Sequence, residues 1–297
     1  MTHRAANIKY IFAERQHLIH RIAVLLPLKG EGITPAFRVF LDRASETRYN
    51  EANQQEVLFP MLQQLTERVW YLPHDEPSDR PVLTYIEGDQ LSVAVDAGAS
   101  PAHVREFYTA ITDQRLSIPE ITILTHWHWD HSFGLCAVNG FTLASKKTAE
   151  KLKEMREWAW TPEAMEARLA SGQEIPFCHE HICLEYRRPE WITVTLPDMT
   201  LAGEGTMDIG GVTIRCETCD SPHSRDALLV STGDVLIIGD AGYEDFYELD
   251  RQYDKGRLAA FMEKLKDRDE TWLVAGHEKP LLRKEFVAYL EGIYKEL

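Results

Sequence analysis

The sequence predicts an α/β fold, a four-layer αββα sandwich in which two mixed β-sheets pack together and helices cover both outer faces. Short apolar runs bounded by turn residues alternate with longer segments that carry helix signals. In addition, residues 85–98 are echoed by residues 230–242, since each has a Gly-Asp turn, a strand and then Asp-Ala-Gly. Two such β-rich halves predict a site between them.

In the first half, turn and capping signals place each element. A strand at 69–73 precedes a hairpin that turns at Gly88-Asp89, and Ser100 caps a helix whose first position is Pro101. The predicted strands are 69–73, 82–87, 90–95, 120–124 and 141–144. The predicted helices are 101–116, 148–160 and 162–170. We interpret residues 146–190 as a helical insertion over the site.

In the second half, glycine pairs and Gly-Asp again separate the strands. Gly210-Gly211 joins two strands, and Gly233-Asp234 turns a hairpin. The predicted strands are 192–196, 207–209, 212–216, 227–231, 235–238 and 271–276. The predicted helices are 250–266 and 284–294.

The strand at 120–124 leads directly into Thr125-His126-Trp127-His128-Trp129-Asp130-His131. Residues two apart on a strand point the same way, so His126 and His128 are expected to bind one ion. Asp130 and His131, past the strand end, then turn toward a second ion. A density of four ligand-type side chains in six positions indicates a metal site. Trp127 and Trp129 alternate with the ligands, which favours packing over substrate contact.

This HxHxDH pattern behind a strand resembles the signature of the metallo-β-lactamase superfamily, over about residues 80–297. The resemblance implies a third histidine, a later aspartate and a final histidine, which His223, Asp240 and His277 supply. Each follows a predicted strand. Carried over by resemblance, the first metal is held by His126, His128 and His223. The second is held by Asp130, His131 and His277, and Asp240 bridges the two.

The departures from the commoner branches narrow the activity. His223 lacks the GHTPGH setting of glyoxalase II type hydrolases, and Asp240 stands where the best known zinc β-lactamases have cysteine. His128 replaces the glutamate usual in the flavodiiron branch. Neither thioesterase activity nor penicillin hydrolysis is therefore implied, and the nuclease branch is disfavoured by the formal charge of −15.

The residues predict a dinuclear zinc hydrolase in which metal-bound hydroxide attacks an ester, thioester, lactone, amide or phosphodiester. Imidazoles and carboxylates also accept iron or manganese. Asp130 is the predicted catalytic residue, which orients the hydroxide or passes on a proton. Two alternatives stay open: a mononuclear iron oxidoreductase resembling the persulfide dioxygenases, and a metal-binding protein without turnover.

Other side chains are expected around the metals. The internal echo makes Asp96 the counterpart of Asp240, so we expect it beneath the metals as a hydrogen-bond acceptor that orients a ligand or a backbone amide. A simple strand-end turn is the alternative. Arg225 and Tyr243, close in sequence to His223 and Asp240, are the candidates for substrate contact. Trp158 and Trp160 either line the pocket or pack in the core.

The amino-acid composition indicates what kind of protein this is. Of its 297 residues 44% are hydrophobic, and no run approaches the roughly 18 apolar residues of a membrane span. We expect a soluble catalytic domain at 61–297, a small-molecule substrate, and neither nucleic acid nor membrane as partner; a homo-oligomer stays open. Residues 1–60 form an extension that lacks a signal-peptide cleavage site, and the sequence leaves open a lid, a dimer arm or an appended helical piece.

Five cysteines, an odd number, favour reduced thiols and a cytoplasmic location. Cys216 and Cys219 lie at a strand end, where packing is the favoured interpretation. Cys178 and Cys183 flank two histidines, and a second, structural metal site there is the less favoured interpretation.

Overall fold

The computed structural model describes residues 61–297, and the predicted N-terminal extension lies outside the described residues. Two mixed sheets form the centre of the fold, as predicted. The first has the order β1 (Gln63–Gln64), β2 (Val69–Leu72), β3 (Leu83–Glu87), β4 (Ser92–Val95), β5 (Ile121–Ile123), β6 (Phe141–Ser145) and β7 (Met199–Leu201). The second has the order β13 (Leu281–Leu282), β12 (Trp272–Ala275), β11 (Val235–Gly239), β10 (Ala227–Thr232), β9 (Thr213–Cys219) and β8 (Glu204–Asp208).

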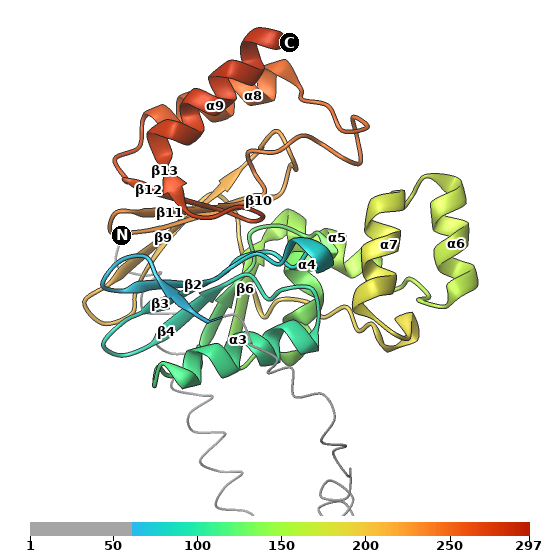
Figure 1. Cartoon of the computed structure of the whole chain (residues 1–297), viewed down its shortest axis with the longest axis horizontal. Helices are drawn as coiled ribbons and strands as arrows, with labels where there is room; N and C mark the ends of the chain where they lie inside the picture. The colour runs from blue at the N-terminus through green and yellow to red at the C-terminus, as the bar shows by residue number, and fades with distance from the viewer. Residues whose placement is uncertain (1–60) are drawn as a thin grey trace, which may run out of the picture. The chain divides into compact units, whose positions relative to one another are not determined.

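Helices cover the outer faces of both sheets, which gives the predicted αββα layers (Figure 1). The α-helices are α3 (Pro101–Asp113), α4 (Trp129–Ser132), α5 (Lys146–Met155), α6 (Pro162–Ser171), α7 (Pro176–Glu185), α8 (Lys255–Lys266) and α9 (Arg283–Glu296). Short 3-10 turns are η1 (Glu76–Ser78), η2 (Phe133–Ala137) and η3 (Pro189–Trp191). None of these helices is both long and apolar enough to cross a lipid bilayer.

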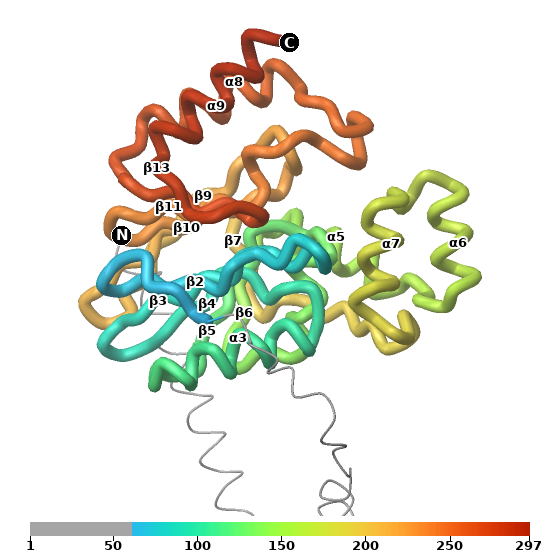
Figure 2. The backbone as a smooth tube through the Cα atoms, in the orientation of Figure 1, coloured from blue at the N-terminus to red at the C-terminus, as the bar shows by residue number. Residues whose placement is uncertain are grey.

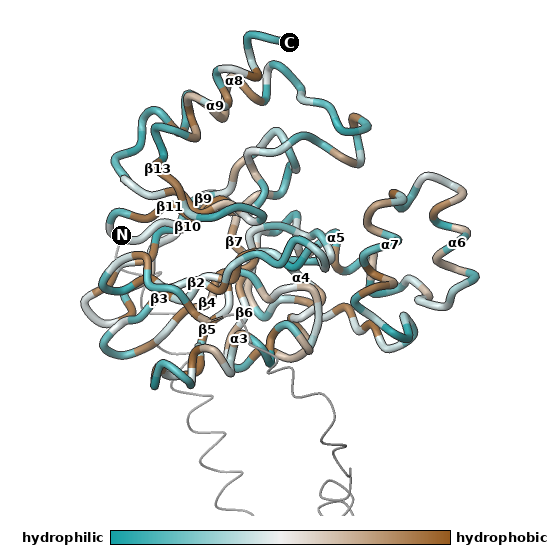
Figure 3. The backbone as a smooth tube through the Cα atoms, viewed as in Figure 1, coloured by the Kyte–Doolittle hydropathy of each residue, from teal (hydrophilic) through white to brown (hydrophobic). Residues whose placement is uncertain are grey.

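The alternation of strand side chains separates the core into layers. Leu229 packs with α8 and α9 outside the second sheet, and Tyr85 packs with α3 outside the first. Their strand neighbours Leu228 and Ile86, both fully buried, point to the opposite faces and therefore into the space between the sheets. Apolar residues accordingly concentrate along the strands of both sheets in Figure 3.

Parallel pairing places several strand ends at one edge of each sheet. β4, β5, β6 and β7 run parallel to one another, and so do β11 and β12. The loops after β4, β5, β11 and β12 therefore leave their sheets at carboxyl ends, where α/β folds present their chemistry. Backbone hydrogen bonds connect the two edges, since Leu228 donates to the Thr125 carbonyl at 2.7 Å.

Three helices lie between β6 and β7, where the insertion was predicted. The structure has α6 close to its expected range, ends α5 at Met155 rather than at 160, and adds α7, which the sequence did not predict. Figure 2 shows α6 and α7 side by side, away from the sheets. Their buried side chains, including Met165 and Ile182, pack in one cluster with Trp160 and Phe133.

Two predicted boundaries were wrong for identifiable reasons. Residues 192–196 are not a strand: Ile192 and Val194 bury their side chains in the cluster of the insertion, but the backbone joins no ladder. Helix α8 begins at Lys255 rather than at 250, because Asp250 and Arg251 have positive φ angles of 50° and 62°, which a helix excludes. Asp254 caps the helix instead, accepting a hydrogen bond from the Arg257 amide at 2.7 Å.

Candidate metal centre

The histidine motif follows β5, as predicted, but all of it lies on a loop and one helical turn, so the strand alternation invoked for His126 and His128 is wrong. β5 ends at Ile123, so His126 follows it in the loop. His128 precedes the first residue of α4, and Asp130 and His131 belong to that short helix. His126 and His128 belong to one group of candidate ligands, and Asp130 and His131 belong to another, which is the division between two ions that the motif suggested. The rings of His126 and His131 are nevertheless neighbours, with centroids 4.3 Å apart.

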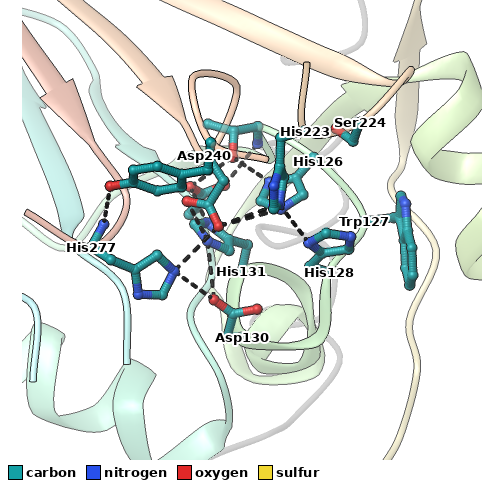
Figure 4. Close-up of polar contacts among 12 residues, drawn as sticks. His126, Trp127, His128, Asp130, His131, His223, Ser224, Asp240 and His277 are labelled. Atoms are coloured by element: carbon teal, nitrogen blue, oxygen red, sulfur yellow. Dashed lines mark hydrogen bonds and ion pairs between the residues drawn. The ribbon is translucent and has the colours of Figure 1, made fainter. Parts of the chain in front are cut away.

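Three imidazoles and one carboxylate form what we call the first ligand group: His126, His128, His223 and Asp240. His223 Nε2 lies 3.0 Å from His128 Nδ1. Asp240 Oδ2 lies 3.8 Å from His126 Nε2 and 3.7 Å from His223 Nε2. All four side chains are buried, and Figure 4 shows them converging on one point.

Two imidazoles and two carboxylates form the second ligand group: Asp130, His131, His277 and, again, Asp240. His131 Nε2 lies 3.1 Å from Asp130 Oδ2 and 3.2 Å from Asp240 Oδ1. His277 Nε2 lies 3.2 Å from one oxygen of each carboxylate. In both groups the candidate ligand atoms lie within 4.8 Å of one another, so Asp240 stands between two potential ion positions.

Hydrogen bonds on the outer ring nitrogens fix which nitrogens face the centre. His223 Nδ1 donates to the Glu244 carbonyl at 2.7 Å, because a carbonyl only accepts. His131 Nδ1 lies 2.7 Å from Asp96 Oδ2. The Nε2 atoms of both rings are then left with their lone pairs directed inward, as metal-ligating histidines require.

Several buried atoms of the centre make no hydrogen bond among the described residues, including His126 Nε2, His131 Nε2 and Asp240 Oδ1. The short distance between His131 Nε2 and Asp240 Oδ1 is an ion-pair contact without hydrogen-bond geometry. Imidazole lone pairs that face carboxylate oxygens repel each other unless a cation lies between them. The residues therefore fit metal ions at both positions.

Electrostatics differ between the two groups. Burial lowers the pKa values of His126 and His128 well below the usual value, and neighbouring imidazoles lower them further. Burial also acts to lower the pKa of His131 and His277, but the neighbouring carboxylates, Asp240 and Asp130 foremost, together outweigh it and raise both pKa values well above the usual value. The second group thus favours a positive charge, which a metal ion supplies in place of a proton.

The carboxylates of the centre remain ionised. Burial alone raises the pKa values of Asp130 and Asp240, but the opposing charge of His131, together with His277, lowers both below their usual range. Ionised oxygens and neutral imidazole nitrogens are suitable ligands for zinc, iron and manganese.

Asp96 lies where the internal echo predicted it, beneath the candidate ligands. Its carboxylate accepts hydrogen bonds from the Thr125 amide at 2.7 Å and the Thr125 hydroxyl at 2.9 Å, besides the contact with His131. Thr125 Oγ1 in turn lies 3.1 Å from His126 Nδ1. Asp96, 3% exposed and with a φ of 67°, therefore orients one imidazole of each ligand group.

Glycine is required where the two ligand-bearing strands approach each other. Gly276 precedes His277, and a Cβ at this position would collide with the Asp240 carboxylate. The Gly276 amide donates to the Gly239 carbonyl at 3.0 Å, which ties the end of β12 to the end of β11. Backbone pairing thus sets the separation of His277 and Asp240.

A cavity of about 220 Å³ opens beside both ligand groups. The wall opposite the ligands comes from the start of α7 and from the loop after β11, with Ile175, Phe177, Cys178, Tyr243, Phe246 and Tyr247. Tyr247 donates to Glu174 at 2.8 Å and thereby joins the two segments. A larger hollow of about 990 Å³ lies at the opposite strand ends, near the Gly233-Asp234 turn, and contains none of the candidate ligands.

The predicted substrate contacts lie in different surroundings. Tyr243 lines the cavity, and its hydroxyl accepts a hydrogen bond from the His277 amide at 3.3 Å. Arg225 is half exposed, pairs with Glu248 at 3.0 Å and is not among the residues that line the cavity. Trp158 and Trp160 do not line it either; Trp160 packs edge-on against Phe133 at 5.1 Å.

The two tryptophans within the histidine motif differ in their surroundings. Trp127 lies outside the cavity lining, with its ring 4.3 Å from His128 and 5.0 Å from Tyr247 (Figure 4). Trp129 is 2% exposed in the core cluster of the insertion, and it also lines the cavity. The aromatic side of the pocket was missed because Phe177 and Tyr247 lie in segments with no strand or helix periodicity in the sequence.

The described cysteines are free thiols. Burial raises the pKa of Cys216 to about 12 and that of Cys219 to about 11, as expected of packed thiols. Cys178 is buried and Cys183 exposed on α7, and no metal-type cluster within residues 61–297 includes either.

Comparison with known proteins agrees with this arrangement. The family description "Metallo-beta-lactamase superfamily" matches residues 81–277, and no curated protein matches the chain. A metallo-beta-lactamase mutant from Cronobacter sakazakii superposes with a TM-score of 0.57 at 14% identity, covering 80% of this chain and 96% of that one. A metallo-beta-lactamase family protein from Thermus thermophilus gives 0.56 at 16%, covering 78% and 81%.

A third solved structure is the inverting sec-alkylsulfatase Pisa1 from Pseudomonas sp., with a TM-score of 0.58 at 15% identity. The match covers 80% of this chain but only 42% of the sulfatase. These likenesses show the fold, and the family match extends over more than half of the sequence, from β3 to His277. The chain belongs to the metallo-β-lactamase superfamily.

Proposed function

We propose that the protein is a dinuclear, zinc-dependent hydrolase of a small molecule with an ester, thioester, lactone, amide or phosphodiester bond. The observation that supports this most is the pair of ligand groups that share Asp240 and border one cavity. Two ions on either side of one carboxylate, next to a space for substrate, form the arrangement expected of two-metal hydrolysis.

When bound, two divalent cations lower the pKa of a coordinated water and polarise the carbonyl or phosphoryl oxygen of the substrate. The chain supplies the geometry for this chemistry. His126, His131 and His223 present fixed nitrogen lone pairs, since their outer nitrogens are held by Thr125, Asp96 and the Glu244 carbonyl. Preorganised ligands of this kind need no rearrangement during turnover.

Asp130 has the position of a proton acceptor. It lines the cavity, and its Oδ2 lies 3.1 Å from His131 Nε2 and 3.2 Å from His277 Nε2. The opposing charge of these imidazoles outweighs burial and lowers the pKa of Asp130, so the carboxylate is ionised at neutral pH. We assign to Asp130 the orientation of the attacking water and the acceptance of its proton.

The metal identity is part of the proposal. The first ligand group offers three imidazole nitrogens and no thiolate, a set that zinc accepts readily and that iron or manganese also tolerates. A mononuclear iron oxidoreductase would need only one of the two groups. Two equivalents of zinc per chain support the hydrolase, and one equivalent of iron supports the oxidoreductase.

The cavity favours a compact substrate. Its volume of about 220 Å³ is below the range of about 300–1,000 Å³ usual for drug-sized ligands. Its wall is aromatic, with Phe177, Phe246 and Tyr247. We therefore choose small lactones, thioesters and phosphodiesters as test substrates. We add a β-lactam and a secondary alkyl sulfate, because two of the similar solved structures are named as a metallo-beta-lactamase and a sec-alkylsulfatase.

The test compares the zinc-loaded protein with its Asp130→Asn variant. We expect turnover of at least one substrate class, and a fall in kcat of at least about a hundredfold in the variant at equal bound zinc. Asp234→Asn, at the exposed β10–β11 turn, is the matched control and should keep full activity. No hydrolysis across the panel, or full activity of Asp130→Asn, would count against the proposal.

A further inference from the structure

We propose that Arg251 holds an anionic group of the substrate, a carboxylate, sulfate or phosphate placed away from the bond that is cleaved. This inference rests on the proposed function for the place of the reaction, and it adds the chemical class of the substrate. Arg251 belongs to the loop between β11 and α8, which also provides one wall of the cavity.

The first observation is the position of the guanidinium group. Its carbon lies 5.2 Å from the centre of the Phe246 ring and 5.7 Å from that of the Phe177 ring. Both rings line the cavity beside the metal ligands, one from each of the two segments that form the wall. Arg251 therefore lies over the aromatic border of the site, where cation–π contacts restrict its movement.

The second observation is that this charge has no carboxylate partner among the described residues. Two other arginines pair with acidic residues of the same loop: Arg225, which precedes β10, with Glu248 at 3.0 Å, and Arg257, on α8, with Asp245 at 2.7 Å. Within residues 61–297, the Arg251 guanidinium contacts the two rings and forms no ion pair. An exposed guanidinium without an acidic partner can pair with an incoming anion, which its planar donors suit.

The third observation is that the loop is strained and fixed at this residue. Asp250 and Arg251 both have positive φ angles, a conformation that costs free energy in residues with a Cβ. The Arg251 amide donates to the Asp245 carbonyl at 2.9 Å, and Asp245 also pairs with Gln252. Such strain persists only where surrounding contacts enforce it, and here it fixes the direction in which Arg251 leaves the backbone.

Asp245 supplies those contacts from a buried position. Its Oδ1 accepts from the amides of Tyr247 at 3.0 Å and Glu248 at 2.8 Å, and its Oδ2 pairs with Arg257. The loop is therefore closed on itself and anchored to α8. A substrate whose reacting bond lies at the metals would reach Arg251 along the aromatic wall.

The experiment measures equilibrium binding, so it does not depend on turnover. Dicarboxylates from malonate to adipate are titrated calorimetrically into zinc-loaded protein, and each is compared with the monocarboxylate of equal length. One carboxylate can occupy the metal centre, and the second reports on the cation. We expect one chain length at which the dicarboxylate binds wild type about fivefold to tenfold more tightly, the gain of a charge-assisted contact at a partly exposed site.

Three variants identify the cation. Arg251→Gln should remove that preference, and Arg251→Lys should keep part of it. Arg188→Gln is the matched control, because Arg188 is also exposed and also lies over an aromatic ring, that of Trp191 at 5.3 Å. Unlike Phe177 and Phe246, Trp191 does not line the cavity. Zinc content and circular dichroism confirm that each variant is folded and loaded.

The outcomes separate the two proposals. A dicarboxylate preference that Arg251→Gln removes and Arg188→Gln keeps supports the anion site, even if no substrate of the panel is hydrolysed. No preference at any length, or one that Arg251→Gln retains, overturns it, even if hydrolysis is found. An equal loss in Arg188→Gln also overturns it, because the effect is then one of general charge.

Discussion

The two ligand groups differ in charge although they share Asp240. In the first, His126, His128 and His223 surround the carboxylate, and burial lowers the pKa of two of these imidazoles. In the second, His131 and His277 lie between Asp130 and Asp240, and these carboxylates raise the pKa of both rings. The first group thus offers three imidazole nitrogens and one carboxylate, and the second offers two of each.

This difference indicates separate tasks for two neighbouring ions. A set rich in nitrogen favours zinc over harder cations, whereas added carboxylate oxygen broadens the choice of metal. The second group also contains Asp130, the carboxylate to which we assign proton transfer. The structure therefore predicts that the two positions differ in affinity, in metal preference and in their sensitivity to substitution.

Removal of the shared ligand should have the largest effect. In Asp240→Ala both groups lose an oxygen, so we expect loss of both zinc equivalents and a fall in activity of at least about a thousandfold, since metal catalysis contributes several kcal/mol to the barrier. Elemental analysis and steady-state kinetics measure this. Retention of both ions would show that Asp240 does not join the two groups.

Single-group variants should separate the positions. His126→Ala is expected to lose the first ion and His131→Ala the second, each keeping about one equivalent of zinc. Activity should fall in both, because the proposed reaction uses both ions. Loss of two equivalents in either variant would mean that one group cannot hold its ion alone.

Substitution of Asp96 should weaken metal binding without removing a ligand. Asparagine tolerates the positive φ of this position, so Asp96→Asn should fold while it disturbs the contact to His131. We expect about tenfold to hundredfold lower zinc affinity, mainly at the second group. Thr125→Val removes the hydroxyl that links Asp96 to His126 but keeps the amide hydrogen bond to Asp96, so it should affect the first group, by a smaller factor. Competition with a chelator measures both. Unchanged zinc affinity in a folded Asp96→Asn variant contradicts the assignment.

Thiol alkylation should have the smallest effect. Neither ligand group contains a cysteine, and the most accessible described thiols are those of Cys136 and Cys183. Iodoacetamide should modify these two and spare Cys216 and Cys219, whose pKa values are raised by burial to about 12 and about 11. Mass spectrometry locates the adducts. Release of zinc on alkylation would place a thiolate in one of the groups.

The layered fold and the convergence of the ligand residues could be predicted because they depend on local signals. Apolar strands, glycine turns and the caps at Ser100 and Pro101 are read within a few residues. His126, His223, Asp240 and His277 each follow a strand or strand-like run, and parallel strand ends meet at one edge. Their residue types and positions were therefore sufficient to bring them together.

The pocket wall could not be predicted in the same way. Helix α7 has almost no amphipathic pattern: Cys178 and Ile182 are its buried side chains, and His179, Glu180 and His181 lie between them. Arg251 looks like an ordinary helix residue in the sequence, and its positive φ arises from contacts with Asp245. Both features depend on tertiary packing rather than on local propensity.

The hydrogen bond between Tyr247 and Glu174 joins two segments that are 73 residues apart in the chain. One half of the wall that this bond holds, at the start of α7, carries none of the candidate metal ligands. The other half follows Asp240 in the loop after β11. Substitutions at the start of α7 can therefore change substrate choice while both ligand groups stay intact. For protein engineering, this makes the Tyr247–Glu174 pair the junction to preserve when either segment is exchanged.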